Sequence, residues 1–178
     1  MALTVAHRAK AYALLDGTAG ADASHTMTAG RFHRTRDPIE SIEANIVERA
    51  AQVVIEPPTP IAGYNNPLDG RDLSTYPLGV RVGYLITSEG DDDIDANGES
   101  SGGGSVEAIE DRANADLKAI RDVLGWQPNW PSLDPVVIDC APEGTPTRQI
   151  LADRVIYEQR FALLTRASLP GSYGPSTS

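Results

Sequence analysis

Residues 106–124, VEAIEDRANADLKAIRDVL, carry the strongest periodic pattern in this sequence. Apolar side chains recur there every three or four residues, so they form one continuous stripe along a helix. Ser105 precedes the stripe as an N-cap, and Gly125 follows it at a position that commonly ends a helix. We therefore predict an amphipathic helix whose stripe faces the core. The stripe comprises Val106, Ile109, Ala113, Leu117, Ile120 and Leu124.

Segments on both sides of this helix alternate in the manner of β-strands. Residues 78–87, LGVRVGYLIT, are the clearest case, and Gly83 within them marks a bulge or a close backbone approach. On the other side, residues 136–140 predict a short strand, followed by a turn at 145–147. The residues of 78–87 that share one face are Val80, Val82, Tyr84 and Ile86.

Residues 154–166, RVIYEQRFALLTR, favour a strand because β-forming residues alternate along them, although a helix is the alternative. One face holds Val155, Tyr157, Phe161 and Leu163, with Gln159 interrupting the row. The opposite face holds Ile156, Ala162 and Leu164. A strand in a small domain usually turns one face to water. A second apolar face therefore suggests cover by a helix or by a neighbouring subunit.

The N-terminal third predicts less regular structure. Residues 3–15 predict a short helix with Val5, Ala9, Tyr12 and Ala13 on one face. Asp37-Pro38 is a good helix start, so a helix over 38–50 is expected. A strand is the rival interpretation of that segment, because the run continues into the extended-looking residues 52–55. The prolines at 57, 58 and 60 end whichever element precedes them.

Several segments predict loops. Residues 16–30 and 61–77 are rich in turn-forming and small polar residues. The acidic segment 88–105 has too little apolar content to fold by itself, and the tail 170–178 is expected to be disordered. Together the elements predict an α+β fold: a mixed or antiparallel β-sheet flanked by helices, with long loops. We expect a single domain over residues 1–169.

The charge of the chain restricts its partners. The 178 residues carry a formal net charge of −10, which argues against a surface that grips nucleic acid phosphates. The densest basic group is Arg31, His33, Arg34 and Arg36, and a solvated or ion-paired edge explains it better than a phosphate site. No apolar run reaches the length of a membrane-spanning helix, and no signal peptide is evident, so we expect no membrane partner and synthesis in the cytoplasm.

No motif predicts catalysis or a cofactor. Asp93-Ile94-Asp95-Ala96-Asn97-Gly98 matches half of a calcium loop, but Gly104 stands where the bidentate carboxylate should be. The glycines before residue 106 lack the lysine of a phosphate-binding loop. The histidines have no metal-ligand spacing, and Cys140, the single cysteine, follows an apolar run as a buried thiol would. We therefore expect no catalytic residues, no cofactor and no metal site.

The tryptophans of the segment after the long helix have two interpretations. Trp126 and Trp130 flank a proline-containing connection, where they can anchor the core or contact a partner. The apolar residues on the second face of 154–166 have the same two roles open to them. The candidate assembly interface is therefore Ile156, Leu164, Trp126 and Trp130.

The order of the predicted elements resembles the tail terminator, or tail completion, proteins of long-tailed bacteriophages. The resemblance is one of layout over about half of the chain. It rests on the segments YPLGVRVGYLIT, VEAIEDRANADLKAIRDVLGW, VVIDC and DRVIYEQRFALLTR.

The resemblance implies a structural virion protein without catalytic residues. Such subunits form a ring, usually a homohexamer, that caps the tail tube and joins the head connector. The implied partners are other copies of the chain, the tail tube protein and head-connector or neck proteins, with DNA passing an acidic lumen without specific binding. The helix expected at 38–50 and the acidic segment 88–105 depart from the family's simplest layout, so a neck adaptor or stopper is the near alternative. A small enzyme and a monomeric binding module are the more distant ones.

Overall fold

The long helix and the alternating strands predicted from the sequence pack against each other in the computed structural model. The structure describes residues 2–17, 33–34, 49–61, 71–86, 106–130, 133 and 135–168. The elements are α1 (Ala2–Leu15), β1 (His33–Arg34), β2 (Arg49–Ile55), β3 (Thr59–Pro60), β4 (Arg71–Leu85), α3 (Val106–Gly125), the 3₁₀ helix η1 (Gln127–Asn129), β5 (Val136–Ile150) and β6 (Arg154–Ser168). The predicted α+β class is confirmed.

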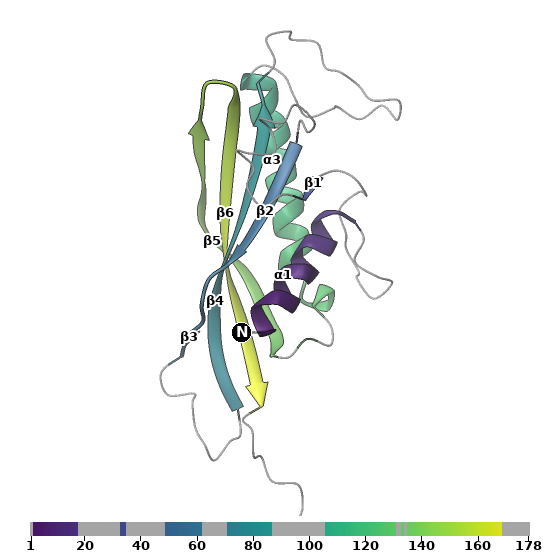
Figure 1. The fold of residues 1–178 in the computed structure, drawn as a ribbon, viewed down its shortest axis with the longest axis vertical. Coiled ribbons are helices and arrows are strands. Elements are labelled where there is room, and N and C mark those ends of the chain that lie inside the picture. Colours follow the sequence, from purple (N-terminus) through teal and green to yellow (C-terminus); the bar gives the residue numbers. More distant parts are fainter. Residues whose placement is uncertain are drawn as a thin grey trace, which may run out of the picture.

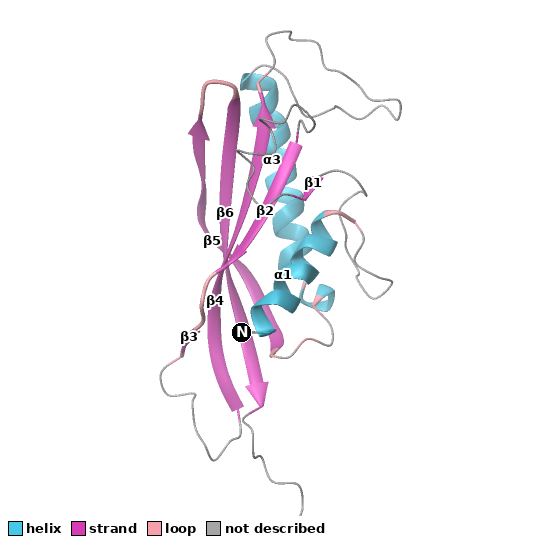
Figure 2. Ribbon diagram, viewed as in Figure 1, coloured by secondary structure: helices cyan, strands magenta, loops and turns pink. Residues whose placement is uncertain are grey.

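The strands form one twisted sheet in the order β1-β2-β4-β6-β5, with β3 paired to β4 (Figure 1). The pairs β2–β4, β4–β6 and β6–β5 are antiparallel, whereas the short β1 lies parallel to β2. β5 and β6 make a long hairpin, which residues 151–153 close. In Figure 2 the helices α1 and α3 lie together on one side of this sheet.

The core lies between that side of the sheet and the helices. The α3 stripe supplies Ile109, Ala113, Leu117, Ile120 and Leu124, all buried as predicted. From the sheet, alternate residues of β4 and β6 enter the same cluster, because successive side chains of a strand point to opposite faces. The buried sheet residues include Val80, Val82, Tyr84, Val155, Tyr157, Phe161 and Leu163. The strand prediction for 154–166 is thus confirmed and its helical alternative is wrong.

The predicted start of β4 is wrong. The strand begins at Arg71, although the turn-forming residues within 71–77 predict a loop. Pairing with the end of β6 outweighs the local preference of these residues for a turn. Pro77 is tolerated because it lies where the partner of β4 on its other side changes from β2 to β3. The β2 pairing ends at Leu78 and β3 begins pairing at Thr75, so the missing N–H of Pro77 is not needed.

The turn predicted at residues 145–147 is also wrong, since β5 continues to Ile150. The turn-forming residues instead produce an irregularity in the register between β5 and β6, between Glu143 and Thr147. Gly144 lies there with a φ of 64°, a conformation that favours glycine. The ladder with β6 resumes at Thr147, so a local signal for a turn produced a bulge inside a longer strand.

The segment 38–50 lies mostly outside the described residues. Its last two residues, 49 and 50, belong to β2, where the predicted helix is wrong and the extended alternative is right. The extended run 52–55 is confirmed as strand. The expectations for residues 18–30, 62–70, 87–105 and 170–178 fall outside the described residues, and with them the calcium-like motif.

The N-terminal helix is confirmed, but the face predicted for it is largely wrong. Val5 is exposed, whereas His7, Ala11, Leu14 and Leu15 are buried beside Tyr12. Alanines dominate this helix, so its sequence marks no clear apolar stripe. Tertiary partners decide its rotation: His7 Nε2 lies 2.9 Å from the carbonyl oxygen of Pro135, and the His7 ring stacks on Tyr76.

Candidate functional site

The two faces of the sheet differ in what covers them. The helices α1 and α3 contact each other and pack on one face, which we call the closed face. Among the described residues no helix packs on the other face, which we call the open face. The strand residues that point to the open face include Val54 of β2, Pro77, Gly79 and Arg81 of β4, and Glu158, Arg160, Ala162 and Leu164 of β6.

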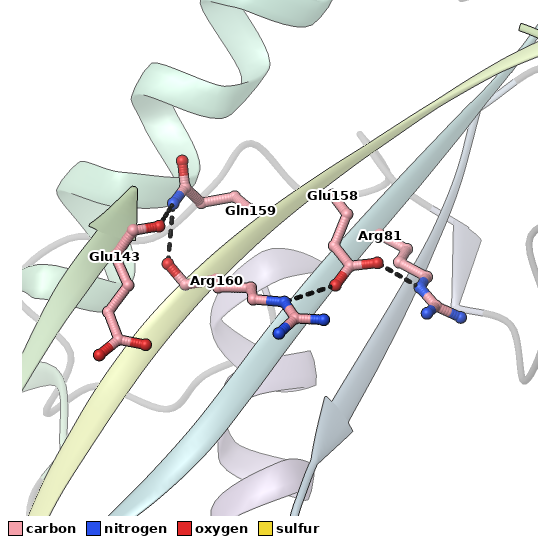
Figure 3. Close-up of polar contacts among 5 residues, drawn as sticks. All are labelled: Arg81, Glu143, Glu158, Gln159 and Arg160. Atoms are coloured by element: carbon pink, nitrogen blue, oxygen red, sulfur yellow. Dashed lines mark hydrogen bonds and ion pairs between the residues drawn. The ribbon is translucent and has the colours of Figure 1, made fainter. Parts of the chain in front are cut away.

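A chain of ion pairs crosses the open face (Figure 3). Nε of Arg81 donates to Oε2 of Glu158 at 2.8 Å, and Nε of Arg160 donates to Oε1 at 3.0 Å. The strand geometry sets this up, because Arg81 is the direct partner of Glu158 across β4 and β6 and Arg160 is two residues further on the same face. In Figure 3 the Glu158 carboxylate lies between the two guanidinium groups, with the Nε of each joined to it.

The ion pairs set the protonation of Glu158. Partial burial would raise the pKa of this carboxyl, but hydrogen bonds and charge from Arg81 and Arg160 outweigh it and leave the pKa below its ordinary value. The carboxylate therefore stays ionised at neutral pH. The side chains of Arg81 and Arg160 remain 48% and 65% exposed, so water and dissolved ions still reach them.

A small hollow opens beside this chain of ion pairs, with a volume of about 40 Å³. Gly79 forms part of its wall and leaves space where another residue would place a side chain. The hollow combines apolar groups with charges of both signs. Its lining is Val54, Glu56, Pro77, Leu78, Gly79, Arg81, Glu158 and Arg160. The formal charges of its two arginines and two glutamates cancel, which suits contact with a protein surface better than capture of a small ion.

The residues predicted for an assembly interface separate into two groups. Trp130 is 1% exposed, and its Nε1 donates to the carbonyl oxygen of Leu124 at 2.8 Å. Ile156 is 7% exposed although it is on the open-face side of β6. Both are buried within the subunit, which corrects their assignment to a contact surface. Trp126 is 43% exposed, and Leu164 is half-buried on the open face.

A second exposed feature lies where η1 meets the start of β5. Val136 and Ile138 are 44% and 37% exposed, and Nε2 of Gln127 donates to the carbonyl oxygen of Val137 between them. The register of β5 shifts between Val137 and Asp139, so Ile138 is the extra residue of a bulge. We call Trp126, Val136, Ile138 and Asp139 the edge patch, because β5 ends the strand order of the sheet.

Sequence reasoning missed the polar groups under the closed face. Asp116 is fully buried on α3 and accepts a hydrogen bond of 2.7 Å from the Tyr84 hydroxyl. Arg121 donates through two nitrogens to Oε1 of the fully buried Gln159, whose Nε2 donates to the carbonyl oxygens of Glu143 and Arg160. A signal existed: Asp116 falls between Ala113 and Leu117 on the α3 stripe, and Gln159 takes an inward position of β6.

These buried polar groups serve packing, because each has a partner inside the fold. Cys140 is similarly enclosed: it is 1% exposed, and burial, reinforced by the neighbouring Asp139 charge, raises the pKa of its thiol to about 12. A thiol in this state is a poor nucleophile. The described residues contain no cluster of His, Cys, Asp and Glu that could hold a metal ion.

Comparison with known proteins does not assign a family. No family model matches the chain, and no curated protein matches it. Among the described helices, none is long and apolar enough to cross a membrane. The candidate site therefore rests on the geometry of the open face and of the edge patch.

Proposed function

We propose that this protein is a non-catalytic structural subunit that assembles with copies of itself into a ring, in the manner of a phage tail terminator. The observation that carries the proposal is the contrast between the faces of the sheet. Helices cover the closed face, while the open face presents half-buried apolar residues around balanced charges. A surface of this composition is what the core of a protein–protein interface requires.

Electrostatics favours the open face as the place of contact. The whole chain carries a net charge of −10, so copies repel one another at most orientations. Around the hollow of the open face, the charges of Arg81 and Arg160 are balanced by those of Glu158 and Glu56. Repulsion is therefore weakest when copies approach through this face, and added salt should weaken it further.

In the proposed virion, the ring caps the tail tube and contacts the head-connector proteins. The acidic character of the chain suits a lumen through which DNA slides without being held, because a net charge of −10 repels the phosphates. A neck adaptor or stopper would use the same kind of surface, and the partner that the ring binds distinguishes these roles.

Assembly is tested with the purified protein, alone and mixed with phage tail tubes, at low and raised salt. We expect light scattering to show a closed oligomer, most simply a hexamer, whose population increases with salt. Electron microscopy should show extra density at the end of the tube. A strict monomer under every condition, with bare tube ends, would refute the proposal and favour a monomeric binding module.

A further inference from the structure

Gly79 is not required by the fold of the subunit. It lies in the interior of β4, between β2 and β6, where glycine weakens a strand because it loses more conformational freedom than other residues. Its backbone does not demand glycine, since the described glycines with positive φ are Gly17 and Gly144. A Cβ built at Gly79 would lie 3.8 Å from Oε1 of Glu158, an ordinary contact.

What the glycine does create is the hollow of the open face. With a volume of about 40 Å³, the hollow can take the end of an aliphatic side chain but not an indole ring. Glycine inside a strand often marks a place where another molecule approaches closely. Arg81 and Arg160 flank this place with exposed guanidinium groups, so a carboxylate on the arriving surface would be attracted (Figure 3).

The edge patch has the complementary features. Ile138 is the extra residue of the bulge, is 37% exposed and ends in an aliphatic group of suitable size. Asp139 follows it directly and is exposed, and its Oδ1 accepts the N–H of Cys140. Trp126, 43% exposed, adds the kind of aromatic surface that concentrates binding energy in interfaces.

We propose that the edge patch of one copy docks on the Gly79 hollow of the next copy. Ile138 enters the hollow, Asp139 pairs with the guanidinium groups of Arg81 and Arg160, and Trp126 covers the rim. When the patch of each copy docks on the hollow of the next, the contact is head-to-tail and closes into a ring if the rotation permits. The inference rests on the proposed self-assembly and specifies its interface.

Two variants test the contact by measuring the concentration at which copies associate. Gly79→Val fills the hollow with a good strand former, and its melting temperature should match or exceed that of the wild type. Ile138→Ser removes the projecting group, and Ile150→Ser, at a 50% exposed residue of the same strand, is its matched control. We expect Gly79→Val and Ile138→Ser each to weaken association by roughly tenfold or more. Ile150→Ser should associate like the wild type.

A mixture of the two variants tests whether the patch of one copy meets the hollow of another. A Gly79→Val copy keeps its patch and an Ile138→Ser copy keeps its hollow, so one intact contact joins them. We expect each variant alone to be monomeric at concentrations where their mixture forms dimers that do not grow into rings. No association in the mixture, while the wild type forms rings, would overturn the proposed contact.

Asp139→Asn distinguishes a specific charge pair from general repulsion. The amide oxygen can keep the hydrogen bond from Cys140, while the change makes the net charge of each copy less negative. If net charge alone governed association, this variant would assemble more readily than the wild type. We expect it to assemble several-fold less readily at low salt, because the attraction to Arg81 and Arg160 is lost.

The outcomes separate this inference from the proposed function. If the wild type forms rings and Gly79→Val and Ile138→Ser do so equally well, the proposed contact is wrong and the ring stands. If the wild type never assembles, with or without tail tubes, the proposed contact and the proposed ring are both refuted.

Discussion

The closed and open faces of the sheet are made by alternate residues of the same strands, yet packing within the subunit constrains mainly the residues of the closed face. On the closed face, Val80, Val82 and Phe161 are fully buried, so the fold requires their apolar character. On the open face, Gly79, Arg81 and Glu158 are accessible or half-buried, and the described helices α1 and α3 pack on the opposite side of the sheet. Where packing within the subunit does not explain the identity of a residue, contact with a partner is the better explanation.

The largest expected contrast comes from placing a charge on either side of α3. Leu117→Asp should unfold or aggregate the subunit, because it buries an unpaired carboxylate in the apolar stripe at a cost of several kcal/mol. Ala115→Asp adds the same charge at an exposed position of the same helix and should cost about 0.6 kcal/mol, the difference in helix propensity. Thermal melts followed by circular dichroism compare the two, and a cooperative wild-type-like melt for Leu117→Asp would contradict the closed-face assignment.

Truncations within β6 compare the two faces along one strand. Phe161→Ala removes a fully buried ring from the closed face and should lower the free energy of unfolding by about 3–5 kcal/mol. Leu164→Ala, at a half-buried position of the open face, should lower it by about 1 kcal/mol. Urea denaturation measures both values. Equal losses would mean that the open face is as tightly packed as the closed one.

The hydrogen bond between Tyr84 and Asp116 tests how strongly polar groups are held under the closed face. Tyr84→Phe deletes the hydroxyl that donates to the buried carboxylate, and we expect a loss of about 1–3 kcal/mol in unfolding free energy. Urea denaturation near neutral pH gives this loss. An unchanged stability would show that the remaining contacts of Asp116 satisfy it alone.

The ion pairs of the open face should contribute least to stability. The folded-state pKa of Glu158 lies below its ordinary value of 4.5, so its contribution is complete above that pH and is lost as pH falls through the folded-state pKa. Because Arg81 and Arg160 are exposed, Glu158→Gln should cost less than about 1 kcal/mol at pH 7. Its difference from the wild type should vanish in acid. A cost that persists at low pH would come from packing instead of charge.

Local sequence patterns determine much of this fold. The stripe of 106–124 determined α3, and alternation determined the closed faces of β4 and β6, since burial of apolar side chains selects the helical or strand period. Composition also determined the acidic character of the chain. Cys140 could be recognised as a buried thiol from the apolar run before it.

Only the tertiary structure decided where the strands begin and end, and which exposed residues lie together. Pairing with β6 extends β4 back to Arg71. It also makes the predicted turn at 145–147 part of β5, as a bulge, because inter-strand hydrogen bonds outweigh the local preference for a turn. The chain Arg81–Glu158–Arg160 depends on register between residues 77 positions apart in sequence, which no local pattern encodes. Trp130 was enclosed and Trp126 left exposed for the same reason: similar residues in one short segment received different surroundings from elements distant in the chain.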